Sequence, residues 1–395
     1  MDRGMPFRNL RVVFLALVFS MGVLALGWLK AQQYDKALYT QVNLVSSGYV
    51  NAQVTDPNLI NPWGVSASAT SPIWISNQAT NTSTLYSITD VQAGMGSRFV
   101  VAIPTTSTSA SQGPTGQVFT GGAGFPIPSS SGTVNSFFVF ANLNGTISGW
   151  NPGSTGGLAS AVIAVSNPGA VYTGLALATV PVPANSPTNA GNVVTYLYAA
   201  DFTPPPDGGI KVFDSSFNAY SFGAGTFVDP ELPSLPSDEV WAPFNVANLG
   251  GNLFVAYAPL PATGGFAIPG LHNGVIAEFS PTGTFMSNIA VSGLLDDPWG
   301  MAMAPSNFGR FSNDLLIGNF GDGKIVGFWQ PSNGKWNYRG LVVGTNHYPL
   351  SLGALWSLWF GNGANGAATN TLYYTSGGPD QTKDGLLGAI VPVTP

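Results

Sequence analysis

The chain has 395 residues, of which only 8% are charged and 45% are hydrophobic, with 50 glycines, 31 prolines and no cysteine. This composition is too apolar for a disordered chain, and its many turn-forming residues favour short strands over long helices. No block of basic residues is present to bind nucleic acid, and the lack of cysteine excludes disulfides, thiol nucleophiles and thiolate metal sites.

The N-terminus has the features of an export signal. Three arginines within the first eleven residues precede an uncharged run, Val12–Leu29, that ends at Lys30. We expect residues 1–31 to be a signal peptide or a signal anchor, and residues 32–395 to be a single domain. The protein is then exported, to the periplasm or the extracellular space. An uncleaved N-terminal anchor would tether it and would be its one contact with a membrane.

Removal of that segment leaves 8 basic and 17 acidic residues and a formal charge of −9. Such a balance disfavours anionic partners.

A unit of sequence recurs along the rest of the chain. An Asn- or Asp-bearing strand, a turn and a further apolar strand appear several times, and the first copy at Asn77–Ser87 lacks the turn glycine. Asn-Gly and Asp-Gly are typical of two-residue hairpins, which require positive φ. The turn glycines are 49 to 65 residues apart and are Gly145, Gly209, Gly274, Gly323 and Gly385.

Each hairpin is preceded by one apolar strand and often followed by another. The preceding strands begin with a small or aromatic residue and are WGVSAS at Trp63, TGLALA at Thr173, FNVANL at Phe244, WGMAMA at Trp299 and LWSLWF at Leu355. Four antiparallel strands per unit is the composition of a propeller blade, and six units fit the chain. We therefore predict an all-β, six-bladed β-propeller. We expect Tyr39–Ser47 to pair with Leu387–Val393 and close the ring.

Four segments rich in Gly, Pro and Ser account for the uneven spacing. They are Pro104–Gly132, Pro181–Gly191, Gly223–Pro236 and Pro259–Gly270. We interpret them as surface loops. The alternative is that one or more overhang a face of the ring and help to shape a site.

Several longer phrases resemble a known family. These are TDPNLINPWG, GPTGQVF, NGTISGWN, PFNVANLGGNLFVAYA, PWGMAMAPSNFGRFSNDLLIGNFGDGKI and LWSLWFGNG. Together, from about Asn43 to Ile390, they resemble an uncharacterised bacterial family of exported β-propeller proteins. The resemblance implies fold and export but no activity. Some members end in a sorting tail with a Pro-Glu-Pro motif, whereas this sequence ends VPVTP, so we expect no anchoring through such a tail.

A wider similarity is to NHL-type and gluconolactonase-like six-bladed propellers. Lactonase-type relatives hold a divalent cation at the central channel with Asn, Asp and Glu side chains, which implies Ca²⁺ as a candidate cofactor. Its candidate ligands here are Asn142, Asp201, Asn319 and Asp297. The alternative is that these side chains form hydrogen bonds at turns and strand ends. The sequence also departs from lactonase repeats, because Trp63, Phe244 and Trp299 occupy a place where a ligand tends to fall.

Trp63, Trp299 and Trp356 recur at one point of their units and should lie at one level of the ring. They are expected to pack between blades, or else to line a channel mouth and stack on an amphipathic ligand. Asn245, one of the Asn and Asp residues whose side chains could form hydrogen bonds with a ligand, is a further candidate for ligand binding.

Catalytic motifs are scarce. His272 lies in a predicted turn, and His347 lies in a loop that could reach a face of the ring. No metalloprotease, nucleophile-elbow or Walker motif is present. The favoured function is therefore non-enzymatic binding at a ring face, without an assured cofactor, of a small molecule, a glycan or an envelope protein. The alternative is a metal-dependent, lactonase-like hydrolase.

Overall fold

A computed structural model describes residues 38–106, 112–182, 192–291, 293–332 and 334–393. The expected signal segment and Pro181–Gly191, apart from its first two residues, lie outside this part of the chain. Within the described residues, no helix is both long and apolar enough to cross a bilayer.

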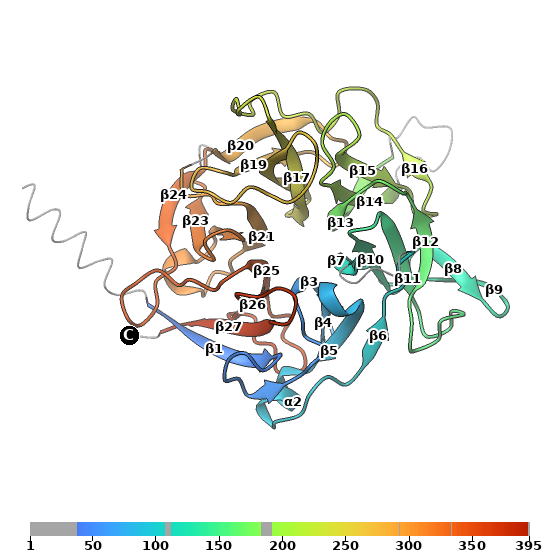
Figure 1. The fold of residues 1–395 in the computed structure, drawn as a ribbon, viewed down its shortest axis with the longest axis horizontal. Coiled ribbons are helices and arrows are strands. Elements are labelled where there is room, and N and C mark those ends of the chain that lie inside the picture. The colour runs from blue at the N-terminus through green and yellow to red at the C-terminus, as the bar shows by residue number, and fades with distance from the viewer. Residues whose placement is uncertain (1–37, 107–111, 183–191, 292, 333, 394–395) are drawn as a thin grey trace, which may run out of the picture.

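Six small antiparallel sheets are arranged in a ring, so the protein is a six-bladed β-propeller, as predicted (Figure 1). Blade 1 consists of β3 (Pro62–Ser66), β4 (Ile73–Asn77), β5 (Thr82–Tyr86) and β6 (Val100–Ala102). Blade 2 consists of β7 (Pro114–Phe119), β10 (Phe138–Asn142), β11 (Thr146–Trp150) and β12 (Val162–Ser166). Blade 3 consists of β13 (Tyr172–Pro181), β14 (Val193–Asp201), β15 (Gly209–Phe213) and β16 (Ala219–Tyr220).

The second half of the ring repeats this order from the inside outward. Blade 4 consists of β17 (Glu239–Leu249), β18 (Asn252–Pro261), β19 (Val275–Phe279) and β20 (Phe285–Val291). Blade 5 consists of β21 (Pro298–Met303), β22 (Leu315–Asn319), β23 (Ile325–Trp329) and β24 (Asn337–Leu341). Blade 6 consists of β25 (Leu355–Phe360), β26 (Leu372–Ser376), β27 (Leu386–Pro392) and β1 (Tyr39–Ser46), and β2 (Val54–Thr55) pairs in parallel with β1.

The ring is closed by strands from the two ends of the described chain. β1 pairs antiparallel with β27, from Tyr39 opposite Pro392 to Ser46 opposite Leu386. In Figure 1 these are the blue and red strands that lie side by side. This pairing is the predicted closure, and it leaves no large open edge between the first and last blades.

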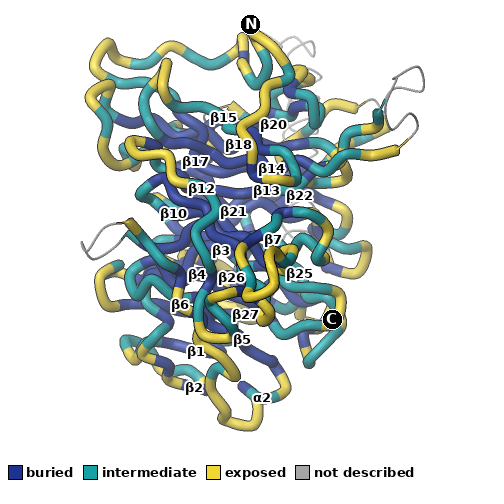
Figure 2. Tube along the Cα trace, turned by 90° about the vertical axis from the view of Figure 1, so that its right-hand side faces the viewer, coloured by how far each residue is buried: buried dark blue, intermediate teal, exposed yellow. Residues whose placement is uncertain are grey.

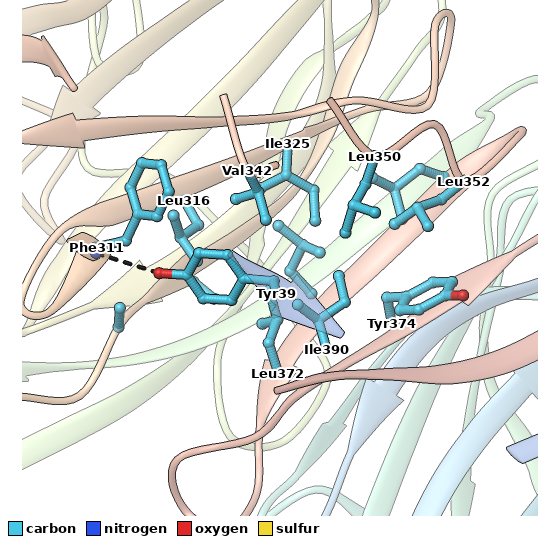
Figure 3. Close-up of a cluster of buried hydrophobic side chains, with 14 of the residues drawn as sticks. Tyr39, Phe311, Leu316, Ile325, Val342, Leu350, Leu352, Leu372, Tyr374 and Ile390 are labelled. Carbon is cyan, nitrogen blue, oxygen red and sulfur yellow. Dashed lines mark hydrogen bonds between the residues drawn. The ribbon is translucent and has the colours of Figure 1, made fainter. Parts of the chain in front are cut away.

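The tyrosine at the start of β1 fastens this closure to blade 5. Figure 3 shows the Tyr39 ring among apolar side chains of blades 5 and 6, including Leu316 and Ile390. Its hydroxyl donates a hydrogen bond to the Phe308 carbonyl at 2.8 Å and accepts one from the Phe311 N–H at 3.4 Å. Burial raises the pKa of Tyr39 to about 12, so the hydroxyl stays protonated and can donate at physiological pH.

One predicted loop is wrong. Residues Pro104–Gly132 were expected to form a surface loop, but they contain β7, which is the inner strand of blade 2, and β8 (Pro126–Ser129). β8 pairs with β9 (Gly132–Asn135) in a hairpin outside the six blades. The described residues also form three short helical segments, which are η1 (Gln78–Thr80), α2 (Ile88–Gln92) and η2 (Gly309–Phe311).

The predicted turn glycines serve two different purposes. Gly145, Gly209 and Gly323 have positive φ, as the turn chemistry predicts. Gly274 and Gly385 do not, and a Cβ at these positions would lie 2.6 Å from the Leu295 Cβ and 1.9 Å from the Leu59 carbonyl oxygen. These two glycines therefore allow a close approach of neighbouring chain segments.

The six inner strands meet at the ring axis and are packed tightly there. Each forms the edge of its own sheet, and Figure 2 shows the strands mostly buried and many of the connecting loops exposed. The third residue of four inner strands is a glycine. These glycines are Gly64, Gly116, Gly174 and Gly300. A Cβ on Gly116 would lie 2.4 Å from the Leu175 amide nitrogen. The inner strands thus approach so closely that a side chain is excluded at these four positions.

Replacing Gly116 with alanine should lower the free energy of unfolding by about 2 kcal/mol, because the nearest atoms include backbone of β13 that cannot rotate away. Chemical denaturation would measure the loss. Gly96→Ala is the matched control, since Gly96 has ordinary φ and its added Cβ would meet only the Val54 side chain at 3.8 Å. Equal stabilities of the two variants would contradict the close packing at the axis.

Candidate functional site

The ring has two faces that differ at the axis. We call the face where the inner strands begin the start face, and the face where they end the end face. The β4–β5, β14–β15 and β22–β23 turns lie on the start face, because each second strand runs antiparallel to its inner strand. The two ends of the central channel are built from different residues.

Aromatic side chains fill the channel at the start face, and we call this group the aromatic plug. Its members are Trp63, Phe202, Phe244, Trp299, Phe320 and Trp356. The Trp63 and Trp356 rings are stacked at a centroid distance of 3.4 Å, and Trp299 meets both edge-on at 5.9 and 5.8 Å. The recurring tryptophans thus share one level, as predicted. However, they pack against each other across the axis and not simply between neighbouring blades.

The plug leaves little tryptophan surface for a ligand at this face. Trp63, Trp299 and Trp356 are all buried, and Trp356 is only 1% exposed. The Trp356 Nε1–H donates to the Asn61 Oδ1 at 2.9 Å, and the Trp299 Nε1–H donates to the Thr173 carbonyl at 3.0 Å. The Trp63 Nε1–H is buried without a hydrogen-bond partner.

Side chains from neighbouring blades hold the strands together below the plug. The Asn245 Nδ2 donates to the Trp299 carbonyl at 2.7 Å, and its Oδ1 accepts the Val246 N–H at 2.8 Å. The Thr115 hydroxyl donates to the Tyr172 carbonyl at 2.7 Å. Asn245, a candidate for ligand binding, therefore has both polar atoms engaged in links within and between blades.

Below this level the channel opens into a cavity of about 370 Å³, which we call the axial cavity. Residues of all six inner strands line it, from Trp299 to the strand ends at Ala67, Asn248 and Trp359. None of the lining residues is charged. Each inner strand pairs on one side only, so its free edge presents backbone N–H and C=O groups toward the axis.

One lining side chain has no partner of its own. The Ser66 hydroxyl is buried, at 8% residue exposure, and forms no hydrogen bond. A buried hydroxyl without a partner costs free energy, so a bound molecule that bonds to it would recover that cost. The axial cavity, at about 370 Å³, lies within the usual size range of small-molecule sites.

The candidate metal ligands are distributed around the ring. Asn142, Asp201 and Asn319 each end the second strand of a different blade. The Asn142 Nδ2 donates to the Thr146 hydroxyl at 2.7 Å, and the Asn319 Nδ2 donates to the Leu294 carbonyl at 2.8 Å. Their Oδ1 atoms are buried without a partner. The amide nitrogens of Asn142 and Asn319 thus form local hydrogen bonds, as in the alternative interpretation of these residues.

Asp201 is satisfied by partners within its own blade. Its Oδ1 accepts the Val171 N–H at 2.9 Å and the Thr203 hydroxyl at 2.7 Å, and its Oδ2 lies 3.8 Å from the Lys211 Nζ. In the described part of the chain, no three His, Cys, Asp or Glu side chains are grouped to hold a metal ion.

Asp297 is the exceptional carboxyl of the start face. It is fully buried, and neither carboxyl oxygen has a hydrogen-bond partner. Burial raises the pKa of Asp297 to about 8, and the neighbouring charge of Asp296 contributes to this shift. The carboxyl is therefore mostly protonated at neutral pH.

Asp297 occupies the same position in blade 5 that Asn61 occupies in blade 1. Asn61 precedes Pro62 in blade 1 as Asp297 precedes Pro298 in blade 5, and both have positive φ. The Gln78 N–H donates to the Asn61 carbonyl, and the Phe320 N–H donates to the Asp297 carbonyl in the same way. Asn61 uses its amide to bind Gln78 and Trp356, whereas the Asp297 side chain has no hydrogen-bond partner.

The two histidines lie in exposed turns. His272 and His347 have φ of 82° and 65°, which is consistent with the predicted turn at His272. His347 lies between β24 and β25, and its N–H donates to the Gly344 carbonyl at 2.9 Å. It does not line the axial cavity.

No protein-family model matches the sequence. An uncharacterized protein of Acanthamoeba polyphaga mimivirus is 30% identical over 323 residues, which are 80% of this chain and 72% of the relative. The chain belongs to the family of this viral protein. A second uncharacterized protein of the same virus is 28% identical over 331 residues, which are 81% of this chain and 77% of the relative. These relatives are viral, so they do not support the predicted bacterial exported family.

The chain is also similar to solved structures, at low sequence identity. A glucose dehydrogenase is 12% identical and covers 90% of this chain and 100% of its own, with a TM-score of 0.47. A protein assigned as a gluconolactonase is 15% identical and covers 71% of this chain and 90% of its own, with a TM-score of 0.37. A streptogramin B lyase is 12% identical, with 91% and 99% coverage and a TM-score of 0.38.

Proposed function

We propose that this protein binds a small uncharged molecule in the axial cavity and does not act on it chemically. The observation that carries the proposal is the cavity itself, with its uncharged lining and the unpaired Ser66 hydroxyl. Free strand edges supply both donors and acceptors, which suits a neutral ligand with several polar groups. A carboxylate, phosphate or ammonium group would find no counter-charge among the lining residues.

The axial cavity is also favoured over the start face as the binding site. The aromatic plug fills the start face, and its rings are already in contact with one another. A ligand would therefore reach the axis from the end face. The contacts it would make there are with Ser66, the strand edges and the half-buried Trp359 ring.

A phenylalanine at Ala67 should block this binding. Ala67 is half-buried at the end of β3 and lines the cavity, so a larger ring there would occupy ligand space. We expect a thermal-shift screen of uncharged small molecules, glycans included, to find a ligand whose affinity falls by about tenfold or more in Ala67→Phe.

Ala69→Phe is the matched control, because Ala69 is exposed two residues further on and does not line the cavity. Binding that survives in Ala67→Phe, or a complete absence of ligands in the screen, would contradict the proposal.

A metal-dependent, lactonase-like hydrolase is the second proposal, and one observation favours it. Asp297 and Asn319 are neighbours in blade 5, where Pro298 pairs with Asn319, and both carry buried oxygens without partners. Asn142 and Asp201 belong to other blades and are bonded locally, so they fit a shared cation less well. Elemental analysis of protein purified without chelator tests this. A stoichiometric ion that Asp297→Asn removes would support the hydrolase, and the absence of an ion would overturn it.

A further inference from the structure

A second group of unpaired oxygens lies far from the axis, where the loop between β16 and β17 crosses the outside of blade 4. Asp229 belongs to this loop, and Asn288 lies on β20, the outermost strand of the blade. The Asn288 Nδ2 donates to the Asp229 Oδ1 at 3.5 Å, so the two side chains converge.

Two acceptor atoms at this point have no donor. The Asp229 Oδ2 and the Asn288 Oδ1 are both buried without a hydrogen-bond partner, and Asp229 is only 7% exposed. The Asp229 Oδ1 is already used, because it accepts the Glu231 N–H at 2.8 Å. Burying a carboxylate oxygen beside an amide oxygen costs free energy. Each of these acceptors loses its hydrogen bonds to water, and two acceptors cannot bond to each other.

The local charge is negative. Glu231 lies close enough that its charge raises the pKa of Asp229, although burial is the larger cause of that shift. None of the ion pairs found within the described residues involves Asp229 or Glu231. The group therefore has oxygen ligands, negative charge and no basic side chain.

We propose that Asp229 and Asn288 bind a hard cation of the Ca²⁺ class through their unpaired oxygens. Carboxylate and amide oxygens are the ligands that Ca²⁺ prefers, and the cation would satisfy both acceptors at once. Its effect would be to fasten the β16–β17 loop to the outer strand of blade 4. Trp241 and Tyr257 lie nearby, since the Trp241 Nε1–H donates to the Pro233 carbonyl of this loop, and the pKa of Tyr257 is raised by burial and further by the charge of Asp229.

Terbium luminescence, excited through these aromatic rings, provides the test. The full chain is freed of metal with EDTA, titrated with Tb³⁺ and then with competing Ca²⁺, and its melting temperature is measured with and without Ca²⁺. We expect saturable emission that Ca²⁺ displaces, and a melting temperature that rises with Ca²⁺. Asp229→Asn should bind at least about tenfold more weakly. Asp238→Asn, which removes an exposed carboxylate from the same loop, should bind like the wild type.

A second variant separates cation binding from a structural role. Asn288→Asp places two carboxylates together, so it should lower the melting temperature without Ca²⁺ and recover it when Ca²⁺ is added. A melting temperature that Ca²⁺ does not restore would overturn the proposal. So would Tb³⁺ emission that is equal in the wild type and Asp229→Asn, because the ion would then lie elsewhere.

Discussion

Trp356→Ala should lower the free energy of unfolding by about 3–5 kcal/mol, the cost of removing a large buried ring and leaving a cavity. Trp356 is 1% exposed, is stacked on Trp63, and has its ring centroid 4.3 Å from that of Phe320. It also joins blade 6 to blade 1 through its hydrogen bond to Asn61. Urea denaturation monitored by far-ultraviolet circular dichroism would measure the loss.

Trp356→Phe separates the two contributions of this side chain. It keeps an aromatic ring in the plug but removes the Nε1–H, which leaves the Asn61 Oδ1 without that donor. We expect it to cost about 1–2 kcal/mol, less than the alanine variant. If Trp356→Ala were as stable as the wild type, the plug would not be a structural element of the ring, and its tryptophans would again be candidates for ligand binding.

Asp297→Asn should stabilise the protein, and the gain should depend on pH. The folded state holds the Asp297 proton up to about pH 8, whereas the unfolded chain loses it above about 3.8. Between these values the folded state binds more protons, so the wild-type stability falls as pH rises and then becomes constant above about pH 8. Asparagine has no such proton, so the gain should be small at pH 4 and reach on the order of 5 kcal/mol at pH 8.

Denaturation curves at pH 4 and pH 8 test this expectation, and blade 1 supplies the precedent, because asparagine already occupies the equivalent position 61. Asp207→Asn, on an exposed turn of the start face, is the control and should change stability by no more than about 0.5 kcal/mol. A loss of stability in Asp297→Asn at neutral pH would indicate an ionised carboxylate held by a cation. That outcome would favour the hydrolase proposal.

Much of the fold could be predicted because each blade repeats its own turn chemistry. The hairpin turns at Gly145, Gly209 and Gly323 mark the junction of second and third strands, and their spacing gives the number of blades. The inner strand β7 was missed because PTGQVF is short and is flanked on both sides by Gly, Pro and Ser. Local composition there predicts a loop, whereas pairing with β10 makes it a strand.

The site was harder to predict because it depends on how strands meet across the ring. The repeat places Trp63, Trp299 and Trp356 at one level of the ring. Their rings touch only because the central channel is narrow, which the sequence does not record. Phe202 and Phe320 join the plug from the ends of second strands, a position the sequence analysis did not consider. The axial cavity is formed largely by backbone edges, which no side-chain motif records.

The pairing of β1 with β27 also has consequences for folding kinetics. Its partners, such as Tyr39 and Pro392, are separated by nearly the whole described chain. Bringing them together carries the largest loop-closure entropy of any strand pair among the described residues, and contacts of such long range slow folding. During synthesis, blades 1 to 5 can form in order as the chain emerges. Blade 6 cannot be completed until β27 leaves the ribosome, so the edge of β1 that β27 will cover stays unpaired until then and is the surface most exposed to mispairing with a second copy.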